Sequence, residues 1–277
     1  MDLGIGLVWC RLAFAQAQPA DREALWKEVA AAEKKGLPKT AAARLQLIYD
    51  SALRDGQHAE AIKALAKRIT HEGAVQGNKP EEKITRLRAE LEKTPAEARP
   101  LLQTILGHWY WQYFRANRYR FLQRTATAQP LGDDFTTWEL PRLYREIDLH
   151  FTNALADGRL KTIPTTDFAD LLTKPTLPEK YRPMLYDFIA HEALGFYSSG
   201  EFAAAKPEDA FEVRASDPLL GPLDKFLAWV PETTDTESPQ FKAVRLYQDV
   251  LRFHLDDADS SALNDTDILR LLHGKRI

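Results

Sequence analysis

The chain has 277 residues, of which 37 are Lys or Arg and 40 are Asp or Glu, giving a formal net charge of −3. Hydrophobic residues make up 44% of the sequence, which is enough for a folded core and excludes a largely disordered protein. The near-neutral charge gives no electrostatic reason to expect nucleic acid or an anionic membrane as partner, and the one cysteine excludes an internal disulfide, an iron–sulfur cluster and a multi-cysteine zinc site.

Residues 1–17 are predicted to be a signal peptide. The apolar stretch over residues 3–15 is shorter than the roughly 20 residues that span a bilayer, but it resembles the core of a secretory signal. Ala15-Gln16-Ala17 fits a small-x-small cleavage site. Asp2 and Arg11 depart from the usual signal, and a plain N-terminal tail is the alternative. We therefore expect an exported protein, periplasmic or extracellular.

Residues 18–277 are predicted to form a single α-helical domain. Strand-like alternation is scarce, whereas helix start and stop signals recur. A first helix is expected over residues 21–35, ended by Gly36, and a second opens at Pro38. A third helix is expected to stop at Gly73. The short turns between these helices predict antiparallel neighbours.

The expected fold class is all-α, an array of antiparallel helical hairpins without a significant sheet. The spacing between Gly36 and Gly73 is close to the period of about 34 residues found in tetratricopeptide-like repeats. The consensus small and aromatic positions of that repeat are missing, so that an irregular α-solenoid is the alternative arrangement.

The later helices are also predicted from their proline and polar starts. Pro80 opens a fourth helix, and Thr94-Pro95 opens a fifth that runs through the aromatic stretch 109–114, with Pro100 either in its first turn or starting a new helix. Residues 125–137 are interpreted as a long loop within the same domain. Further helices are expected over residues 138–160, 183–197, 219–229, 239–255 and 261–273.

The sequence contains no nucleophile elbow, no phosphate-binding glycine loop and no zinc-binding helix. Asp187 and His191 are four residues apart, so the carboxylate could orient the imidazole on one helix face. As catalysis, the pair would need a nucleophile or metal from elsewhere in the fold. The structural interpretation is an Asp–His pair that lines a groove between helices. We therefore expect that the protein is not an enzyme and that it has no catalytic residue and no cofactor.

Acidic residues are concentrated over residues 256–267. The run lacks the glycine and the bidentate glutamate that an EF-hand calcium loop needs, so no metal is expected there. Ser260, Asn264 or Asp265 is expected instead to cap the last helix, with the acids favouring its N-terminal dipole.

The densest feature is the aromatic stretch Trp109-Tyr-Trp-Gln-Tyr-Phe114, which is followed by several arginines. Because these arginines do not share a helical face and the net charge is negative, base stacking is not favoured. The first interpretation is a core helix with large buried rings. The alternative is a peptide-binding partner groove lined by these residues: Trp109, Trp111, Trp138, Asp187 and His191.

Six stretches of the sequence form a recognisable ordered set: Lys35-Gly-Leu-Pro-Lys-Thr-Ala41, Trp109-Tyr-Trp-Gln-Tyr-Phe114, Asn117-Arg-Tyr-Arg120, Gln123-Arg-Thr125, Asp134-Phe-Thr-Thr-Trp138 and Arg182-Pro-Met-Leu-Tyr-Asp-Phe-Ile-Ala-His-Glu-Ala-Leu194. With these stretches in this order, the sequence resembles the helical N-terminal region of bacterial alpha-2-macroglobulin-like proteins. The resemblance covers the chain from about residue 22 to its end, and no single motif is diagnostic.

The resemblance implies an exported protein associated with endopeptidase inhibition. In that family the helical region precedes β-sandwich domains that carry a bait segment and often a thioester. This chain has no thioester motif and no run of short strands, so no functional residue of the trap can be carried over.

We therefore expect a non-enzymatic helical module of a macroglobulin-like protein that lacks the bait and thioester segments. The alternative is a stand-alone α-hairpin adaptor that binds peptide or protein partners. The expected partner is a protein, either macroglobulin domains or a periplasmic or extracellular protein. No nucleic acid is expected, and membrane contact is expected only through an uncleaved signal.

Overall fold

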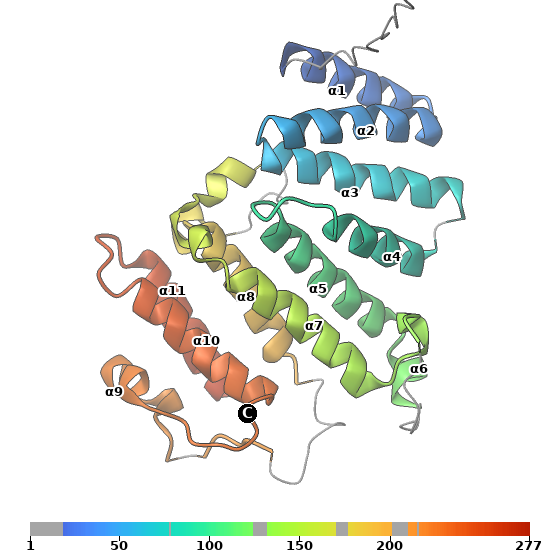
Figure 1. Ribbon diagram of the computed structural model, residues 1–277. Helices are drawn as coiled ribbons and strands as arrows, with labels where there is room; N and C mark the ends of the chain where they lie inside the picture. Colours follow the sequence, from blue (N-terminus) through green and yellow to red (C-terminus); the bar gives the residue numbers. More distant parts are fainter. Residues whose placement is uncertain (1–18, 78, 124–131, 170–176, 201–209, 215) are drawn as a thin grey trace, which may run out of the picture. The chain divides into compact units, whose positions relative to one another are not determined.

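The computed structural model describes residues 19–77, 79–123, 132–169, 177–200, 210–214 and 216–277 (Figure 1). Within these ranges the chain forms eleven α-helices and no strand, and one isolated bridge joins Pro164 and Met184. The all-α fold class is confirmed, whereas the repeat arrangement stays a prediction. No described helix has both the length and the apolar character of a membrane span. The predicted signal peptide lies outside the described residues.

The described chain divides into two compact units, one up to Val75 and one from Gln76 onwards, which are taken separately below. The single domain predicted over residues 18–277 stays a prediction.

Three helices build the first unit: α1 (Pro19–Lys34), α2 (Pro38–Arg54) and α3 (His58–Val75), with α2 packed against both of the others (Figure 1). Pro38 opens α2 as predicted, because its missing N–H and fixed φ suit a first turn. Gly36 follows α1 in the left-handed region, with a φ of 65°. The predicted stop at Gly73 is wrong. The helix continues to Val75, and Gly77 is the glycine that turns left-handed there, with a φ of 90°.

A buried arginine joins the three helices of the first unit. Arg22 of α1 is only 5% exposed, and its Nε donates to Glu60 of α3 at 2.8 Å. Its Nη1 donates to Ser51 and Asp55 at the C-terminal end of α2. Because a buried guanidinium needs such partners, these contacts fix the register of α1 on the other two helices.

The second unit contains the other eight helices. Their bounds are α4 (Pro80–Leu91), α5 (Arg99–Ala116), α6 (Arg118–Leu122), α7 (Leu140–Leu155), α8 (Leu185–Tyr197), α9 (Leu223–Ala228), α10 (Pro239–Phe253) and α11 (Ser261–Gly274). Helix α5 packs extensively on α7, and α10 contacts both α8 and α11 (Figure 1).

Several predicted helix bounds in the second unit differ from the observed ones. The helix expected over residues 219–229 is a 3-10 turn, Pro218–Leu220, followed by the short α9. The fifth helix does not begin at Pro95, because such a helix would lose a hydrogen bond and clash with the ring of Pro100. The alternative that a new helix starts at Pro100 agrees with the structure, where α5 begins at Arg99 and holds Pro100 in its first turn. Helix α7 ends at Leu155 instead of continuing to residue 160. Asp157 then caps a short 3-10 helix, Gly158–Thr162, by accepting the N–H of Arg159 at 3.0 Å.

Aromatic rings form the core between α5, α7 and α8. Tyr110 and Phe114 of α5 are completely buried, as the core-helix interpretation predicts for this stretch. The ring of Phe135 lies 5.0 Å from that of Tyr110, and the ring of Tyr144 lies 5.3 Å from that of Phe114, both in edge-on geometry. Phe135 belongs to a 3-10 turn, Phe135–Thr137, at the end of the predicted loop. Residues 125–131 of that loop lie outside the described part.

Candidate functional site

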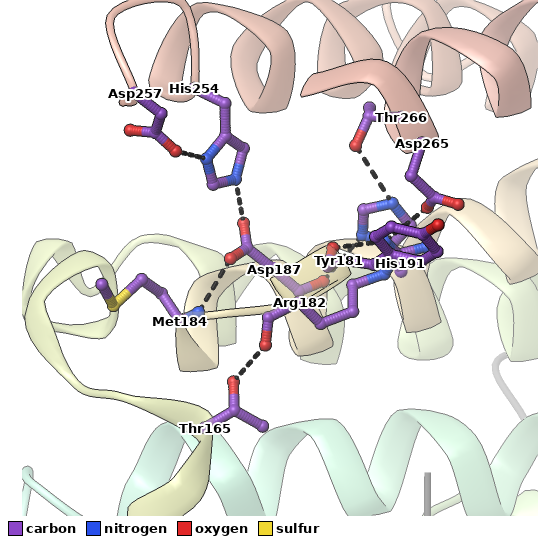
Figure 2. A network of polar contacts seen from close by, with 10 residues as sticks. All are labelled: Thr165, Tyr181, Arg182, Met184, Asp187, His191, His254, Asp257, Asp265 and Thr266. Atoms are coloured by element: carbon purple, nitrogen blue, oxygen red, sulfur yellow. Dashed lines mark hydrogen bonds and ion pairs between the residues drawn. The ribbon is translucent and has the colours of Figure 1, made fainter. Parts of the chain in front are cut away.

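Asp187 anchors a polar network at the start of α8 (Figure 2). Its side chain is completely buried, and its Oδ2 accepts the backbone N–H of Met184 at 2.9 Å, as the acid of a capping box does. Its Oδ1 lies 2.7 Å from Nε2 of His254, the residue that follows α10. Helix N-termini favour negative charge, so both the N-terminal dipole and the imidazole stabilise this carboxylate.

His254 lies between two carboxylates and is 2% exposed. Its Nε2 faces Asp187, and its Nδ1 lies 2.6 Å from Oδ2 of Asp257. Burial alone lowers the pKa of His254, but the hydrogen bonds and charges of Asp187 and Asp257 outweigh it and hold this pKa above its ordinary value. The imidazole therefore donates from both nitrogens as a cation, and neither nitrogen is left to accept a proton from a substrate.

His191 does not pair with the carboxylate of Asp187, although the spacing of the two residues allowed that contact. Its Nδ1 lies 2.8 Å from the backbone carbonyl oxygen of Asp187 and donates to it. Burial, followed by the charge of Arg182, lowers the pKa of His191 to about 3, so the imidazole is neutral. Its Nε2 then accepts the hydroxyl of Thr266 at 3.4 Å.

These polar contacts join α8 to α10 and α11 (Figure 2). Arg182, just before α8, binds Asp265 of α11 at 2.6 Å, and Thr165 donates its hydroxyl to the carbonyl of Arg182 at 2.7 Å. The hydroxyl that faces His191 belongs to Thr266, which is completely buried and out of reach of a substrate. The arrangement therefore acts as a clamp between helices.

Three of the acidic residues after α10 are engaged with different side chains. Asp257 contacts His254, Asp265 contacts Arg182, and Asp267 accepts Nε of Arg270 at 2.8 Å. Within the described part of the chain, no three His, Cys, Asp or Glu side chains are grouped so that they could hold a metal ion.

Of the three residues expected to cap the last helix, Ser260 is the N-cap residue of α11. Its side chain makes no capping bond to the backbone but accepts Nδ2 of Asn264 at 3.1 Å, and Asp265 is engaged with Arg182. Asp259 instead accepts the N–H of Ser261 at 2.9 Å.

The structure does not bring the three tryptophans of the predicted groove together. Trp138 is 2% exposed and stacks on Tyr110 in the aromatic core. Trp109 and Trp111 are half-buried on different faces of α5. Lys83 of α4 covers the ring of Trp109 at 4.8 Å, whereas Trp111 packs edge-on against Phe196 of α8. The three rings therefore contribute to separate packing contacts.

A groove with a volume of about 780 Å³ opens elsewhere in the second unit, between the C-terminal end of α7, α8 and α10. Its apolar lining consists mainly of aromatic rings: Tyr186, Tyr197, Phe241 and Phe253. Its charged lining consists of four cations and one carboxylate: Lys161, Lys242, Arg245, Arg252 and Asp249. None of the five residues predicted for a partner groove lines it. Tyr186 is adjacent to Asp187, so the clamp and the groove occupy different sides of α8.

Comparison of the chain with family models, with curated proteins and with solved structures finds no match.

Proposed function

We propose that the chain is a non-enzymatic helical module that binds a peptide segment of a partner protein in the groove between α7, α8 and α10. The observation that carries the proposal is the lining of the groove, where aromatic rings lie beside cationic side chains. Its volume of about 780 Å³ falls within the range of about 300–1,000 Å³ that is usual for ligand pockets. Large rings with polar groups beside them are typical of sites that bind protein segments.

The polar network supports the non-enzymatic part of the proposal. A general base needs an accepting nitrogen within reach of a substrate proton. Both nitrogens of His254 face carboxylates, and the nitrogens of His191 contact a backbone carbonyl and the hydroxyl of Thr266. This is the geometry of a helix clamp, which holds α8 and α10 in place as two walls of the groove.

A display library of random peptides tests the proposal, with Gly158→Trp as the variant that fills the groove. Gly158 is exposed in the lining, and a Cβ placed there meets no atom within 4 Å, so a tryptophan adds an indole to the groove without a clash at its Cβ. Gly132→Trp is the matched control, because Gly132 is equally open but lies before the 3-10 turn Phe135–Thr137 and outside the lining.

We expect peptides to be enriched on the wild-type chain and on Gly132→Trp, and to be lost on Gly158→Trp. Enriched peptides that bind Gly158→Trp as tightly as the wild type would overturn the groove as the binding site. A library without any enriched peptide would overturn peptide binding itself.

The association with macroglobulin-like endopeptidase inhibition is the second part of the proposal, and it rests on the ordered sequence motifs. This part includes the proposal that the protein is exported, which is supported by the signal-like pattern of residues 1–17. An adjacent reading frame that encodes macroglobulin β-sandwich domains would support the association. Genomes that carry this chain without any such frame nearby would remove it.

A further inference from the structure

The cations of the groove differ in how far their charge is compensated. Lys242 binds Asp148 at 2.7 Å and Glu237 at 2.6 Å, so two carboxylates neutralise it. Arg252 pairs with Asp249 at 3.3 Å. Lys161 and Arg245, by contrast, have no carboxylate partner among the described residues.

The surroundings of Lys161 and Arg245 leave their charges available to a ligand. Nζ of Lys161 lies 4.6 Å from the ring centre of Tyr186 and 5.3 Å from that of Phe253, so the rings position the ammonium group without neutralising it. Arg245 donates from Nη1 to the neutral amide of Gln248 at 3.3 Å, which leaves its other N–H groups for an acceptor. The groove therefore combines two uncompensated positive charges with apolar walls.

We infer that the groove binds an acidic peptide segment in which Asp or Glu residues lie next to large apolar residues. This inference rests on the proposed function and names its ligand class. Carboxylates of the peptide contact Lys161 and Arg245, and its apolar side chains pack on Phe253 and Phe241.

The charge pattern favours a peptide over a nucleic acid or a lipid surface. A nucleic acid needs a track of cations along its backbone, and an anionic membrane attracts clusters of several Lys and Arg residues. Here two uncompensated cations lie in a short groove of a chain with a net charge of −3. Two carboxylates flanked by apolar side chains match this pattern in number and in polarity.

Fluorescence anisotropy with the full chain tests the inference. The probe is a fluorescein-labelled peptide of alternating Glu and Leu residues, and the matched probe carries Gln in place of Glu. We expect the Glu peptide to bind at least about tenfold more tightly than the Gln peptide, and its affinity to fall as salt is added. Replacing Leu by Ser in the peptide is expected to weaken binding as well, because the rings lose their apolar contacts.

Charge reversals in the groove provide the second arm of the test. Lys161→Glu and Arg245→Glu are each expected to weaken the Glu peptide about tenfold or more, whereas Lys161→Arg keeps binding. Lys225→Glu is the control, because Lys225 is exposed on α9 and lies outside the groove lining. Circular dichroism establishes that each variant keeps the helical content of the wild type.

Each unfavourable outcome has a defined meaning. Equal binding of the Glu and Gln peptides, or reversals that leave affinity unchanged, would overturn the acidic ligand. Tighter binding of polyuridylate or of phosphatidylserine vesicles than of the Glu peptide would overturn the peptide class. If the display experiment yields neutral or basic peptides that still require an open groove, the proposed function stands and this inference fails.

Discussion

The protonation state of His191 leads to a quantitative prediction about stability. The folded chain holds the pKa of this histidine at about 3, against an ordinary value of 6.5, because of burial and the nearby charge of Arg182. The unfolded chain therefore binds a proton near its ordinary pKa that the folded chain does not bind. By linkage, the free energy of unfolding falls as the pH drops below about 6.5. Replacing the residue by His191→Gln removes this contribution.

The size of the effect follows from the unfolded state. Between about pH 7.5 and pH 5.5, an ordinary histidine becomes almost fully protonated while folded His191 stays neutral. The free energy of unfolding then falls by about 1.4 kcal/mol, which corresponds to one pKa unit. The value is the same for any folded pKa well below 5.5, so it does not depend on the depth of the shift.

Urea unfolding at the two pH values, followed by tryptophan fluorescence, measures this difference. Four of the tryptophans, Trp109, Trp111, Trp138 and Trp229, belong to the second unit and therefore report on it. We expect the wild type to lose about 1.4 kcal/mol more than His191→Gln on acidification.

Thr266→Val is the control, because it alters the hydroxyl that faces His191 and leaves the histidine in place. Its pH dependence is expected to match that of the wild type. An equal pH dependence in the wild type and in His191→Gln would refute the neutral imidazole.

Two further changes test the clamp and the core. Asp187→Asn removes the charge that faces His254 and is expected to cost about 3–5 kcal/mol in urea unfolding. Because the pKa of His254 is raised, the stability that its charged form contributes is complete below about pH 6.5 and is lost as the pH rises through the folded pKa. Asp187→Asn should therefore also reduce the loss of unfolding free energy at alkaline pH. A cost below about 0.5 kcal/mol would contradict the clamp. Gly107→Ala places a Cβ 3.2 Å from the ring of Phe151 and should cost about 1–3 kcal/mol in thermal unfolding. Gly195→Ala on the exposed side of α8 is the control, because its Cβ lies no closer than 3.7 Å to another residue, the ring of Trp111, so the change should be neutral or stabilising. Equal effects of the two alanines would contradict the packing of α5 on α7.

Helix starts were predictable from the sequence because their causes are local. Pro38, Pro80 and Pro239 each lie in a first helical turn, where a missing N–H costs nothing. Gly36 turns left-handed after α1 as predicted, whereas Gly73 remains inside α3. Glycine permits a helix end but does not require one, so Gly73 by itself did not locate the end of α3.

The polar network and the groove depend on contacts between distant parts of the sequence. The spacing of Asp187 and His191 shows that they share a helix turn, but the carboxylate is used by the N–H of Met184 and by His254, which belongs to another helix. No local pattern marks His254 as that partner. The groove likewise requires α7, α8 and α10 to meet, so Lys161 could not be assigned to it from sequence alone.

The groove as the binding site of the chain is the central claim, and amide NMR spectra test it most directly. The ¹⁵N-labelled chain is titrated with the tightest peptide selected from the display library. We predict that the largest shift changes fall on the residues of the groove lining, from the end of α7, from α8 and from α10. Shift changes concentrated on the first unit, or on the exposed face of α11, would contradict the account.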